Sequence, residues 1–410
     1  MLTSQYSGGH MKKKNESWLK PHHSLVRNIL YAVIYPYSRL VYGITINKFK
    51  EQEKRPYLIL YNHQTAFDQF FVGMSFSGPL YYVASEDIFS KGWVSSVIRF
   101  LVAPIPIKKQ TTDVRAVMNC IRVAKEGGSI AIAPEGNRTY SGKTEYMNGA
   151  IASLAKKLKL PIAIYKIEGG YGVHPRWSDK VRRGKMQSGV SRVIMPEEYA
   201  DMSADSLLEL IQKEMFANEG NAEKRFLSAH RAEYLERAMY VCPFCKLSEF
   251  ESNKSSIKCK KCGREIEYGE DTRLTGVGFD FPFSHVTEWY DYQKAHINSL
   301  DVTALTDTPI YSDRASLSEV IVYKEKILIS KMSEIQLFGD RIVIDGERVF
   351  PFAEVTAMSV LGKNKLNIYH GGKVYQLKSD KRFNALKYVN IYFRYRNIIG
   401  GNSDVEFLGL

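Results

Sequence analysis

The sequence predicts an α/β layered domain, followed by a cysteine-containing segment and a small β-rich domain. Over residues 57–235, short apolar runs alternate with amphipathic stretches, a pattern typical of strands and helices packed in layers. Four of the five cysteines form two Cys-x-x-Cys pairs further along the chain. Residues 309–378 then divide into short strand-like runs separated by glycine-containing turns, which favours an antiparallel sheet.

Size and charge set the broad class of the protein. A chain of 410 residues with 44% hydrophobic content can bury a large core, and domains of ~100–200 residues imply two or three units. The formal net charge of +13, from 57 Lys and Arg against 44 Asp and Glu, predicts an anionic partner. A phospholipid surface, a phosphorylated substrate and a nucleic acid all satisfy that charge.

The cysteine content and the N-terminal segment indicate the compartment. Five cysteines are too few for a secreted disulfide scaffold, and paired Cys-x-x-Cys motifs favour metal binding on the reducing, cytosolic side. The first twenty residues are polar and basic, so they do not resemble a signal peptide. We expect residues 1–23 to form a flexible leader.

Residues 24–50 are predicted to form a membrane-associated amphipathic helix. Apolar residues recur at helical spacing of three or four, at Leu25, Ile29, Val33, Tyr37 and Leu40. Basic residues and a proline interrupt the stretch, so it is not a convincing transmembrane span, which needs ~20 predominantly apolar residues. Because acidic residues are missing and tyrosines are interleaved, the composition suits a helix at the lipid headgroup boundary. An ordinary core helix of the next domain is the alternative.

Residues 51–235 are predicted to form the α/β domain. The expected strands are Tyr57–Tyr61, Ser129–Ala133 and Ile162–Tyr165, and the expected helices are Phe67–Ser77, Val114–Glu126 and Gly149–Lys159. A charged stretch from Met202 to Leu235 is expected to close the domain as one helix or a pair of helices.

His63 and Asp68 form the first candidate catalytic motif, His-x4-Asp, which follows the first predicted strand. A five-residue offset within one helix would rotate the two side chains apart. With His63 in a loop and Asp68 in the first turn of a helix, the carboxylate can fold back onto the imidazole. Such a pair can act as a general base on a hydroxyl without a protein nucleophile. Taken alone, the motif favours a surface histidine beside an aspartate that caps the helix or interacts with its dipole.

A second motif, Pro134-Glu135-Gly136-Asn137-Arg138, follows the strand that ends near Ala133. Gly136 allows a sharp turn, and the Arg138 guanidinium can present a bidentate fork to a phosphate. Glu135 and Arg138 are therefore candidate substrate-binding residues, with a surface Arg–Glu pair as the alternative.

In this order and spacing, the two motifs resemble those of the lysophospholipid and 1-acylglycerol-3-phosphate acyltransferase family. Residues 105–109 (IPIKK) and 160–164 (LPIAI) are similar to two further blocks of that family. The resemblance implies a layered, glycerophosphate-acyltransferase-like α/β fold. It also implies that His63 is the general base, that Asp68 orients it, and that Glu135, Gly136 and Arg138 belong to the acceptor site.

The same resemblance implies that Lys108 or Lys109 contacts the acceptor phosphate. The family usually carries arginine there, and lysine keeps the charge but loses the planar fork. The implied donor is acyl-CoA or acyl carrier protein, and the implied acceptor is the sn-2 hydroxyl of 1-acylglycerol 3-phosphate. Another lysophospholipid or lyso-lipid acceptor is the first alternative.

Residues 236–270 are predicted to form a zinc ribbon. Two Cys-x2-Cys knuckles supply the four ligands that a structural zinc ion requires, Cys242, Cys245, Cys259 and Cys262. With four cysteine ligands no position stays open for water, so a catalytic metal is not expected. The surrounding lysines would also suit a nucleic acid, but Phe244 and Phe250 are the sole stacking candidates of the segment, so nucleic acid is an unlikely partner.

The remainder is predicted as a linker over 271–308, a domain similar to pleckstrin-homology (PH) or GRAM domains over 309–398, and a tail over 399–410. The expected strands are Val320–Tyr323, Ile327–Ser330, Ile335–Phe338, Arg341–Ile344, Leu366–Tyr369 and Val374–Leu377, before a helix over Phe383–Arg396. The sequence thus predicts a phospholipid-synthesising acyltransferase on the cytoplasmic face of an anionic membrane, peripheral or monotopic. A membrane-docking interaction protein without enzymatic activity is the alternative from another class.

Overall fold

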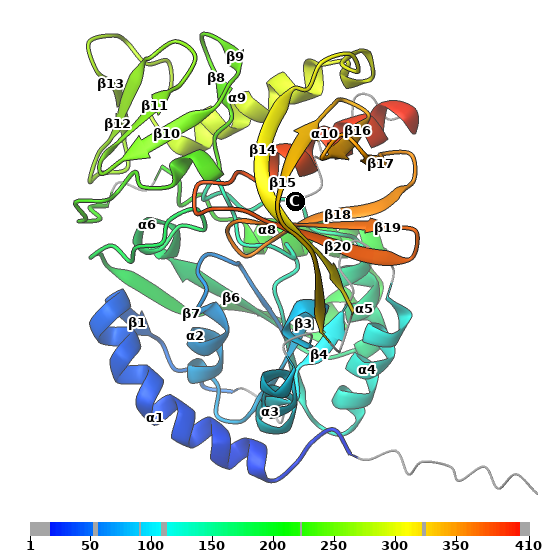
Figure 1. Cartoon of the computed structure of the whole chain (residues 1–410). Helices are drawn as coiled ribbons and strands as arrows, with labels where there is room; N and C mark the ends of the chain where they lie inside the picture. Colours follow the sequence, from blue (N-terminus) through cyan, green and yellow to red (C-terminus); the bar gives the residue numbers. More distant parts are fainter. Residues whose placement is uncertain are drawn as a thin grey trace, which may run out of the picture.

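The first part of the chain folds as an α/β/α sandwich around a seven-stranded sheet (Figure 1). The computed structural model describes residues 17–51, 56–89, 92–107, 113–221, 224–321 and 325–401. The sheet strands are β1 (Ile44–Ile46), β2 (Leu58–Tyr61), β3 (Leu80–Ser85), β4 (Ile105–Ile107), β5 (Ser129–Ile132), β6 (Ile162–Glu168) and β7 (Met186–Ile194). Their order is β1-β7-β6-β2-β5-β3-β4, and β2 to β6 run parallel, whereas β1 and β7 run the opposite way.

Two hydrophobic layers cover the sheet, as the alternating pattern predicts. One face packs on α4 (Val114–Lys125), α5 (Ala150–Leu158) and α8 (Ala204–Met215). The other face packs on α1 (His22–Tyr42) and α2 (Asp68–Ser75). The predicted α/β class and each of the six expected elements are present, with ends that differ by a few residues. The other helical segments of this part are η1 (Glu86–Phe89), α3 (Trp93–Val102), α6 (Gly170–Val173) and α7 (Pro196–Tyr199).

The expectation of helix from Met202 to Leu235 is correct for the first half alone. Helix α8 ends at Met215, and the described residues that follow contain no helix until η2 (Leu235–Arg237). The reason is local, because Asn218-Glu219-Gly220 is turn-forming and its backbone bonds to the loop after β5. The Glu219 N–H donates to the Gly142 carbonyl at 2.8 Å.

The segment that precedes α1 is packed, which corrects the predicted leader over 1–23 in its described part. The Ser17 hydroxyl and the backbone N–H groups of Trp18 and Leu19 all donate to the Glu126 carboxylate, at 2.6–3.1 Å. The Trp18 indole N–H donates to the Ala103 carbonyl at 2.9 Å. The helix thus begins at His22, and it ends at Tyr42, before Gly43 turns the chain into β1.

Helix α1 turns its apolar stripe outward. The five residues singled out from the sequence, Leu25, Ile29, Val33, Tyr37 and Leu40, are 45–87% exposed. Their neighbours Tyr31, Ile34 and Tyr35 pack instead against the sheet core. The stripe is therefore not a core-facing surface, contrary to the core-helix alternative. Within the described ranges, no helix combines the length and the apolar character needed to cross a bilayer.

The cysteine-containing segment forms two small antiparallel sheets. The strands are β8 (Val241–Cys242) and β9 (Lys246–Leu247), followed by β10 (Phe250–Asn253), β11 (Ser256–Cys259), β12 (Glu265–Tyr268) and β13 (Leu274–Gly276). Their short hairpins place the two Cys-x2-Cys knuckles side by side. Phe250, expected as a stacking platform, is buried and meets Trp289 edge to face at 5.2 Å.

The segment 271–308 is not a linker. It contains α9 (Val286–Ser299), whose Val286, Trp289, Tyr290 and Ile297 are fully buried, and the short helix η3 (Val302–Ala304). One hydrophobic cluster joins α9, the cysteine segment and the C-terminal strands. The sequence carried a helical signal here that the prediction of a linker missed. The buried residues recur at a spacing of three or four on one face of α9, at Val286, Trp289, Tyr290, Gln293 and Ile297, and the opposite face is exposed.

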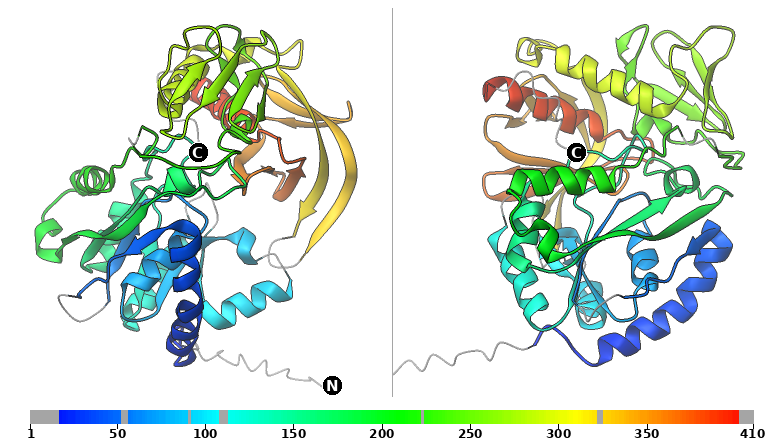
Figure 2. Two further views of the ribbon diagram at one scale, coloured as in Figure 1. Left: turned by 90° about the vertical axis from the view of Figure 1, so that its left-hand side faces the viewer. Right: turned by 180° about the vertical axis from the view of Figure 1, so that it is seen from behind.

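The C-terminal part is a seven-stranded antiparallel sheet packed on one helix. Its strands are β14 (Tyr311–Val320), β15 (Lys326–Leu337), β16 (Arg341–Ile344), β17 (Arg348–Pro351), β18 (Val355–Leu361), β19 (Lys365–His370) and β20 (Lys373–Lys378), and its helix is α10 (Leu386–Ile399). The order β17-β16-β15-β14-β20-β19-β18 is a meander closed by the β14–β20 pair. Figure 2 shows these yellow and orange strands curving beside the first domain.

The strand predictions in this part differ in three places. The strand placed at Val320–Tyr323 shares only Val320 with β14, and residues 322–323 lie outside the described residues. The separate strands Ile327–Ser330 and Ile335–Phe338 are one long strand, β15. The sequence prediction omitted β17 and β18. The β-rich architecture with one closing helix is confirmed, and likeness to PH or GRAM domains stays a prediction.

Candidate active site

The His-x4-Asp and Glu-Gly-x-Arg motifs meet at one edge of the central sheet. The first follows β2 and the second follows β5, and these strands are parallel neighbours, with Leu58 opposite Ile130. Carboxyl ends of adjacent parallel strands lie at the same edge, so the two loops emerge together. The backbone joins them directly, since the Thr139 N–H donates to the His63 carbonyl at 3.1 Å.

His63 and Asp68 are in hydrogen-bond contact. The distance from His63 Nδ1 to Asp68 Oδ2 is 2.8 Å, which indicates that the neutral imidazole carries its proton on Nδ1 and leaves Nε2 as a base. The His63 side chain is 23% exposed, and Nε2 has no hydrogen-bond partner among the described residues. Burial lowers the pKa of His63, and the hydrogen bond to Asp68 opposes that effect. The imidazole is therefore neutral at pH 7 and able to accept a proton.

A turn of the chain holds Asp68 in place. Its carboxylate is fully buried and accepts the Gln64 N–H at 2.6 Å, the Thr65 N–H at 2.9 Å and the Thr65 hydroxyl at 2.6 Å. Asp68 is also the first residue of α2, where the helix dipole favours a negative charge. The same carboxylate thus caps the turn and orients the imidazole.

Glu135 lies beneath the histidine loop. One carboxyl oxygen accepts the His63 N–H at 3.0 Å, and the other accepts the Glu145 N–H at 3.3 Å. Burial raises the pKa of Glu135 to about 8, although the two backbone hydrogen bonds favour its charged form. The Glu135 side chain therefore holds the backbone of His63 in place. This role differs from the direct binding of substrate.

Gly136 and Arg138 shape the rest of this loop. Gly136 has φ +70°, a conformation that side chains rarely adopt, and its N–H donates to the Ala133 carbonyl at 3.0 Å. The Arg138 guanidinium is largely enclosed, and its Nη1 is buried without a hydrogen-bond partner in the described part of the chain. Burial, and then the nearby Arg176, lower the pKa of Arg138 to about 10. Lys108 and Lys109 lie outside the described residues.

Two positions that the sequence did not reveal fix the histidine loop to β6. The Asn62 side chain bonds the Ile167 backbone twice, donating to its carbonyl at 2.9 Å and accepting its N–H at 2.8 Å. Gly170 follows β6, where a Cβ atom would lie 2.7 Å from the Gln64 Cβ. An asparagine directly before the motif carries no distinctive signal, because its partner lies 105 residues away.

Three arginines that follow α6 make contacts within the protein. Arg176 and Arg182 are buried, and Arg192 is paired with Glu198 and Glu214 at 3.1 and 2.6 Å. The Arg182 guanidinium lies over the rings of Trp177 and Tyr268, at 4.8 and 4.9 Å from their centroids. Arg182 therefore joins the first domain to the cysteine-containing segment through Tyr268.

The four cysteines of the two knuckles form one cluster that could bind a metal ion. Their sulfur atoms all lie within 4.8 Å of one another, and the pairs Cys242–Cys262 and Cys245–Cys259 are each 3.9 Å apart. The glycine after the second knuckle, Gly263, has φ +73° and donates its N–H to the Cys259 carbonyl, which closes the knuckle turn.

Comparison with known proteins finds similarity to acyltransferases in the first part of the chain. Residues 44–165 match a family model described as Acyltransferase, a range that contains both motifs. No curated protein matches the chain. Among solved structures, the chain is similar to the 1-acyl-sn-glycerophosphate (LPA) acyltransferase PlsC from Thermotoga maritima, with 18% identity and a TM-score of 0.38 over 48% of this chain and 82% of that chain.

Glu135 should make the stability of the protein depend on pH. Since its pKa is raised to about 8, the folded state holds a proton that the unfolded state releases above pH 4.5, so wild-type stability falls as pH rises from 4.5 to 8. Glu135→Gln should remove this fall, worth roughly 2–4 kcal/mol over the window. Urea unfolding of both proteins at several pH values measures the difference, and parallel stability profiles would contradict it.

Proposed function

We propose that this protein transfers an acyl group from a thioester donor to a hydroxyl of a lysophospholipid. The observation that carries the proposal is the His63–Asp68 pair, at 2.8 Å, within a domain that matches an acyltransferase family model. The specific acceptor proposed is the sn-2 hydroxyl of 1-acylglycerol 3-phosphate, which gives phosphatidate. The donor is acyl-CoA or acyl carrier protein.

In this proposal His63 is the general base. Its Nε2 takes the proton of the acceptor hydroxyl as that oxygen attacks the thioester carbonyl, while Nδ1–H stays bonded to Asp68. Collapse of the tetrahedral intermediate breaks the carbon–sulfur bond, and the imidazolium returns the proton to the leaving thiolate. Asp68 stabilises the imidazolium through its charge, and Glu135 keeps the His63 backbone in position.

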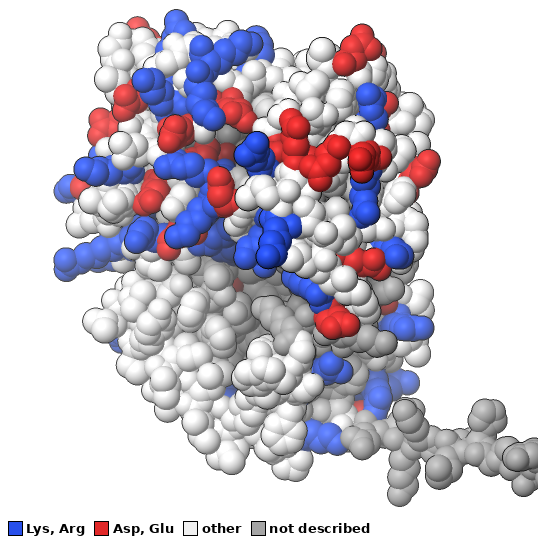
Figure 3. Space-filling view, in the orientation of Figure 1, with Lys and Arg blue, Asp and Glu red and all other residues white. Residues whose placement is uncertain are grey.

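The exposed apolar surface supports a location on a membrane. The α1 stripe lies beside α3, where Trp93, Val97 and Phe100 are also exposed. Figure 3 shows this lower face without charged side chains over much of its area, below a belt of lysines and arginines. An apolar face bordered by cations suits an anionic phospholipid surface, with apolar side chains in the acyl boundary and cations at the headgroups. We propose peripheral or monotopic association with the cytoplasmic face.

The cysteine cluster is proposed to hold a structural zinc ion. Zinc bound to four sulfurs at about 2.3 Å separates them by about 3.8 Å, close to the two spacings of 3.9 Å. Cys242, Cys245, Cys259 and Cys262 would hold the ion, which would supply folding energy and no catalytic step.

Replacement of His63 tests the proposed mechanism. His63→Ala should lower kcat roughly 10²–10⁴-fold, because no other described group is positioned to take the proton. Wild-type kcat/KM should rise with pH and level off with a midpoint below 6.5, since burial lowers the pKa of the base. Acyl transfer from acyl-CoA to 1-acylglycerol 3-phosphate is the assay.

The matched control is His370→Ala, which removes a surface histidine bonded to Glu354 at 3.0 Å and should keep full activity. Retained activity in His63→Ala would exclude the mechanism.

Charged substitutions on α1 test the membrane face. The double change Val33→Glu and Leu40→Glu should weaken sedimentation with phosphatidylglycerol vesicles at least roughly tenfold, since each residue loses the free energy of apolar burial. Val277→Glu changes an equally exposed apolar residue in the cysteine-containing segment and should bind as wild type does. Equal vesicle binding by the wild type, the α1 double variant and Val277→Glu would contradict the proposal that the α1 stripe contacts the membrane.

Metal analysis tests the cysteine cluster. The purified protein should contain about one zinc per chain, and Cys262→Ser should lower both the zinc content and the thermal unfolding temperature. Cys120→Ala removes the one cysteine outside the cluster and should leave the zinc content unchanged. A metal-free wild type that unfolds at the same temperature with and without added zinc would contradict the proposal.

A further inference from the structure

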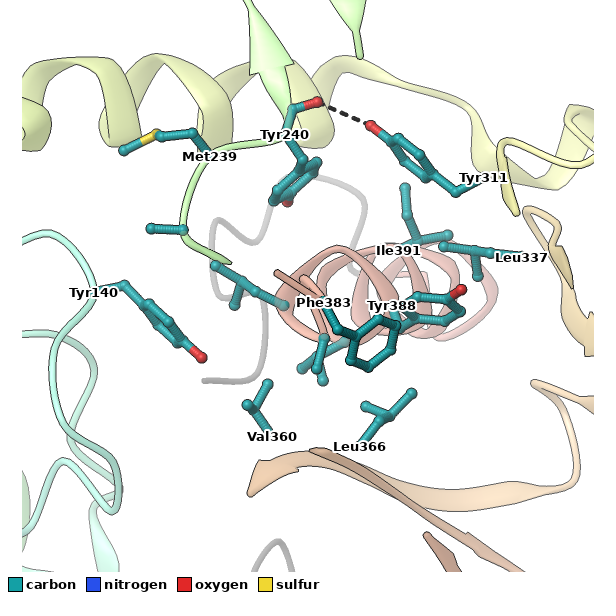
Figure 4. Packing of buried hydrophobic residues seen from close by; sticks show 14 of the residues in the cluster. Tyr140, Met239, Tyr240, Tyr311, Leu337, Val360, Leu366, Phe383, Tyr388 and Ile391 are labelled. Atoms are coloured by element: carbon teal, nitrogen blue, oxygen red, sulfur yellow. Dashed lines mark hydrogen bonds between the residues drawn. The ribbon is translucent and has the colours of Figure 1, made fainter. Parts of the chain in front are cut away.

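The tip of the β18–β19 hairpin, defined here as residues 360–364, contacts the candidate active-site domain. The Lys363 ammonium donates to the Ser178 carbonyl at 2.5 Å and to the Asp179 carboxylate at 2.9 Å. Figure 4 shows Val360 and Leu366 of this hairpin packed in the same cluster as Tyr140, which comes from the loop after β5. A segment outside the family match at 44–165 thus reaches the loop that carries Arg138.

Arg176 joins the hairpin tip to that loop. Its guanidinium donates to the Arg138 carbonyl at 2.9 Å and also lies 3.5 Å from both the Asn137 side-chain oxygen and the Val360 carbonyl. It packs over the Tyr140 ring at 4.2 Å and is 3% exposed. Because one planar group holds three partners, the position of the hairpin and the position of Arg138 are coupled.

The region between these elements carries more positive than negative charge. Buried nitrogen atoms of two side chains, Arg138 Nη1 and His174 Nε2, lack hydrogen-bond partners among the described residues. His174 is buried with its Nδ1 at 3.3 Å from the Tyr42 hydroxyl, and burial, Lys363 and Arg138 lower its pKa to about 4.

The nearby acids are already engaged. Asp179 is shared between Lys363 and Arg237, at 2.9 and 2.8 Å. Asp68 already accepts hydrogen bonds on both oxygens. Buried cations in excess of their acids are costly unless an anion binds there.

We propose that Lys363 of the hairpin tip is a second cation for the acceptor phosphate, beside Arg138, and that Arg176 is a positioning residue that holds the hairpin tip and the Arg138 loop together. The inference rests on the proposed function, because it states how that site would recognise a phosphorylated acceptor. A phosphomonoester brings two negative charges and several acceptor oxygens, so it matches two cations better than a phosphodiester does. The C-terminal sheet is then part of the acceptor site, and it determines headgroup specificity.

Binding of glycerol 3-phosphate to the full chain tests this site without requiring acyl transfer. The ligand should raise the thermal unfolding temperature of the wild type, and glycerophosphocholine, a diester, should have a weaker effect. Lys363→Ala should weaken glycerol 3-phosphate binding about tenfold, a typical loss for one charge-assisted contact. Lys373→Ala, at the opposite end of β19, is the matched control and should bind as wild type does.

Two further measurements separate a binding role from a structural one. Lys363→Gln keeps a donor for the Ser178 carbonyl but loses the charge, so it should fold normally and still show the weakened binding. Arg176→Lys keeps the charge but loses the planar fork, so it should raise the KM for the acceptor and leave the KM for acyl-CoA unchanged.

The outcomes distinguish this inference from the proposed function. If the wild type binds glycerol 3-phosphate through Lys363 but transfers no acyl group, the proposed function is contradicted. The phosphate site is supported by the same result. Wild-type affinity in Lys363→Gln and Lys363→Ala, or no stabilisation of the wild type by millimolar glycerol 3-phosphate, would overturn the inference.

Discussion

The parallel pairing of β2 with β5 is the contact on which the candidate active site depends. Because Leu58 lies opposite Ile130, the loops that follow the two strands emerge at one edge of the sheet. Residues 72 positions apart then meet, and the Glu135 carboxyl accepts the His63 N–H. A shift of one residue in this pairing would exchange the side chains of β2 between the two covered faces of the sheet, where they would no longer fit their packed neighbours.

The site combines a locally determined part with a part that needs distant partners. Asp68 is held by groups within five residues of it, so the turn forms from the motif itself. Glu135, Asn62 and Gly170 lie on different strands or loops and fix this turn to the sheet. The local turn provides the base and its orienting carboxylate, and the distant contacts provide rigidity.

The C-terminal half is integrated with the first domain more closely than a chain of separate modules would be. Tyr140 and Trp177 of the first domain belong to the same hydrophobic cluster as α9, the cysteine-containing segment and the C-terminal sheet. The buried Arg237, which follows the first domain in the chain, donates hydrogen bonds to the Asp179 carboxylate and the Trp177 carbonyl of that domain. Contacts of this kind let a domain outside the acyltransferase match influence the environment of Arg138.

The sequence by itself determined the α/β class, the order of the motifs, the close approach of His63 and Asp68 and the two cysteine knuckles. These features depend on hydrophobic period, on turn-forming residues and on spacings of a few residues, which are local properties of the chain. Only the tertiary structure decided that the apolar stripe of α1 faces outward, that residues 271–308 form part of a core, and that Arg176 and Lys363 lie near Arg138. Each of these depends on contacts between residues from 38 to 185 positions apart, and side-chain periodicity carries no information about such a partner.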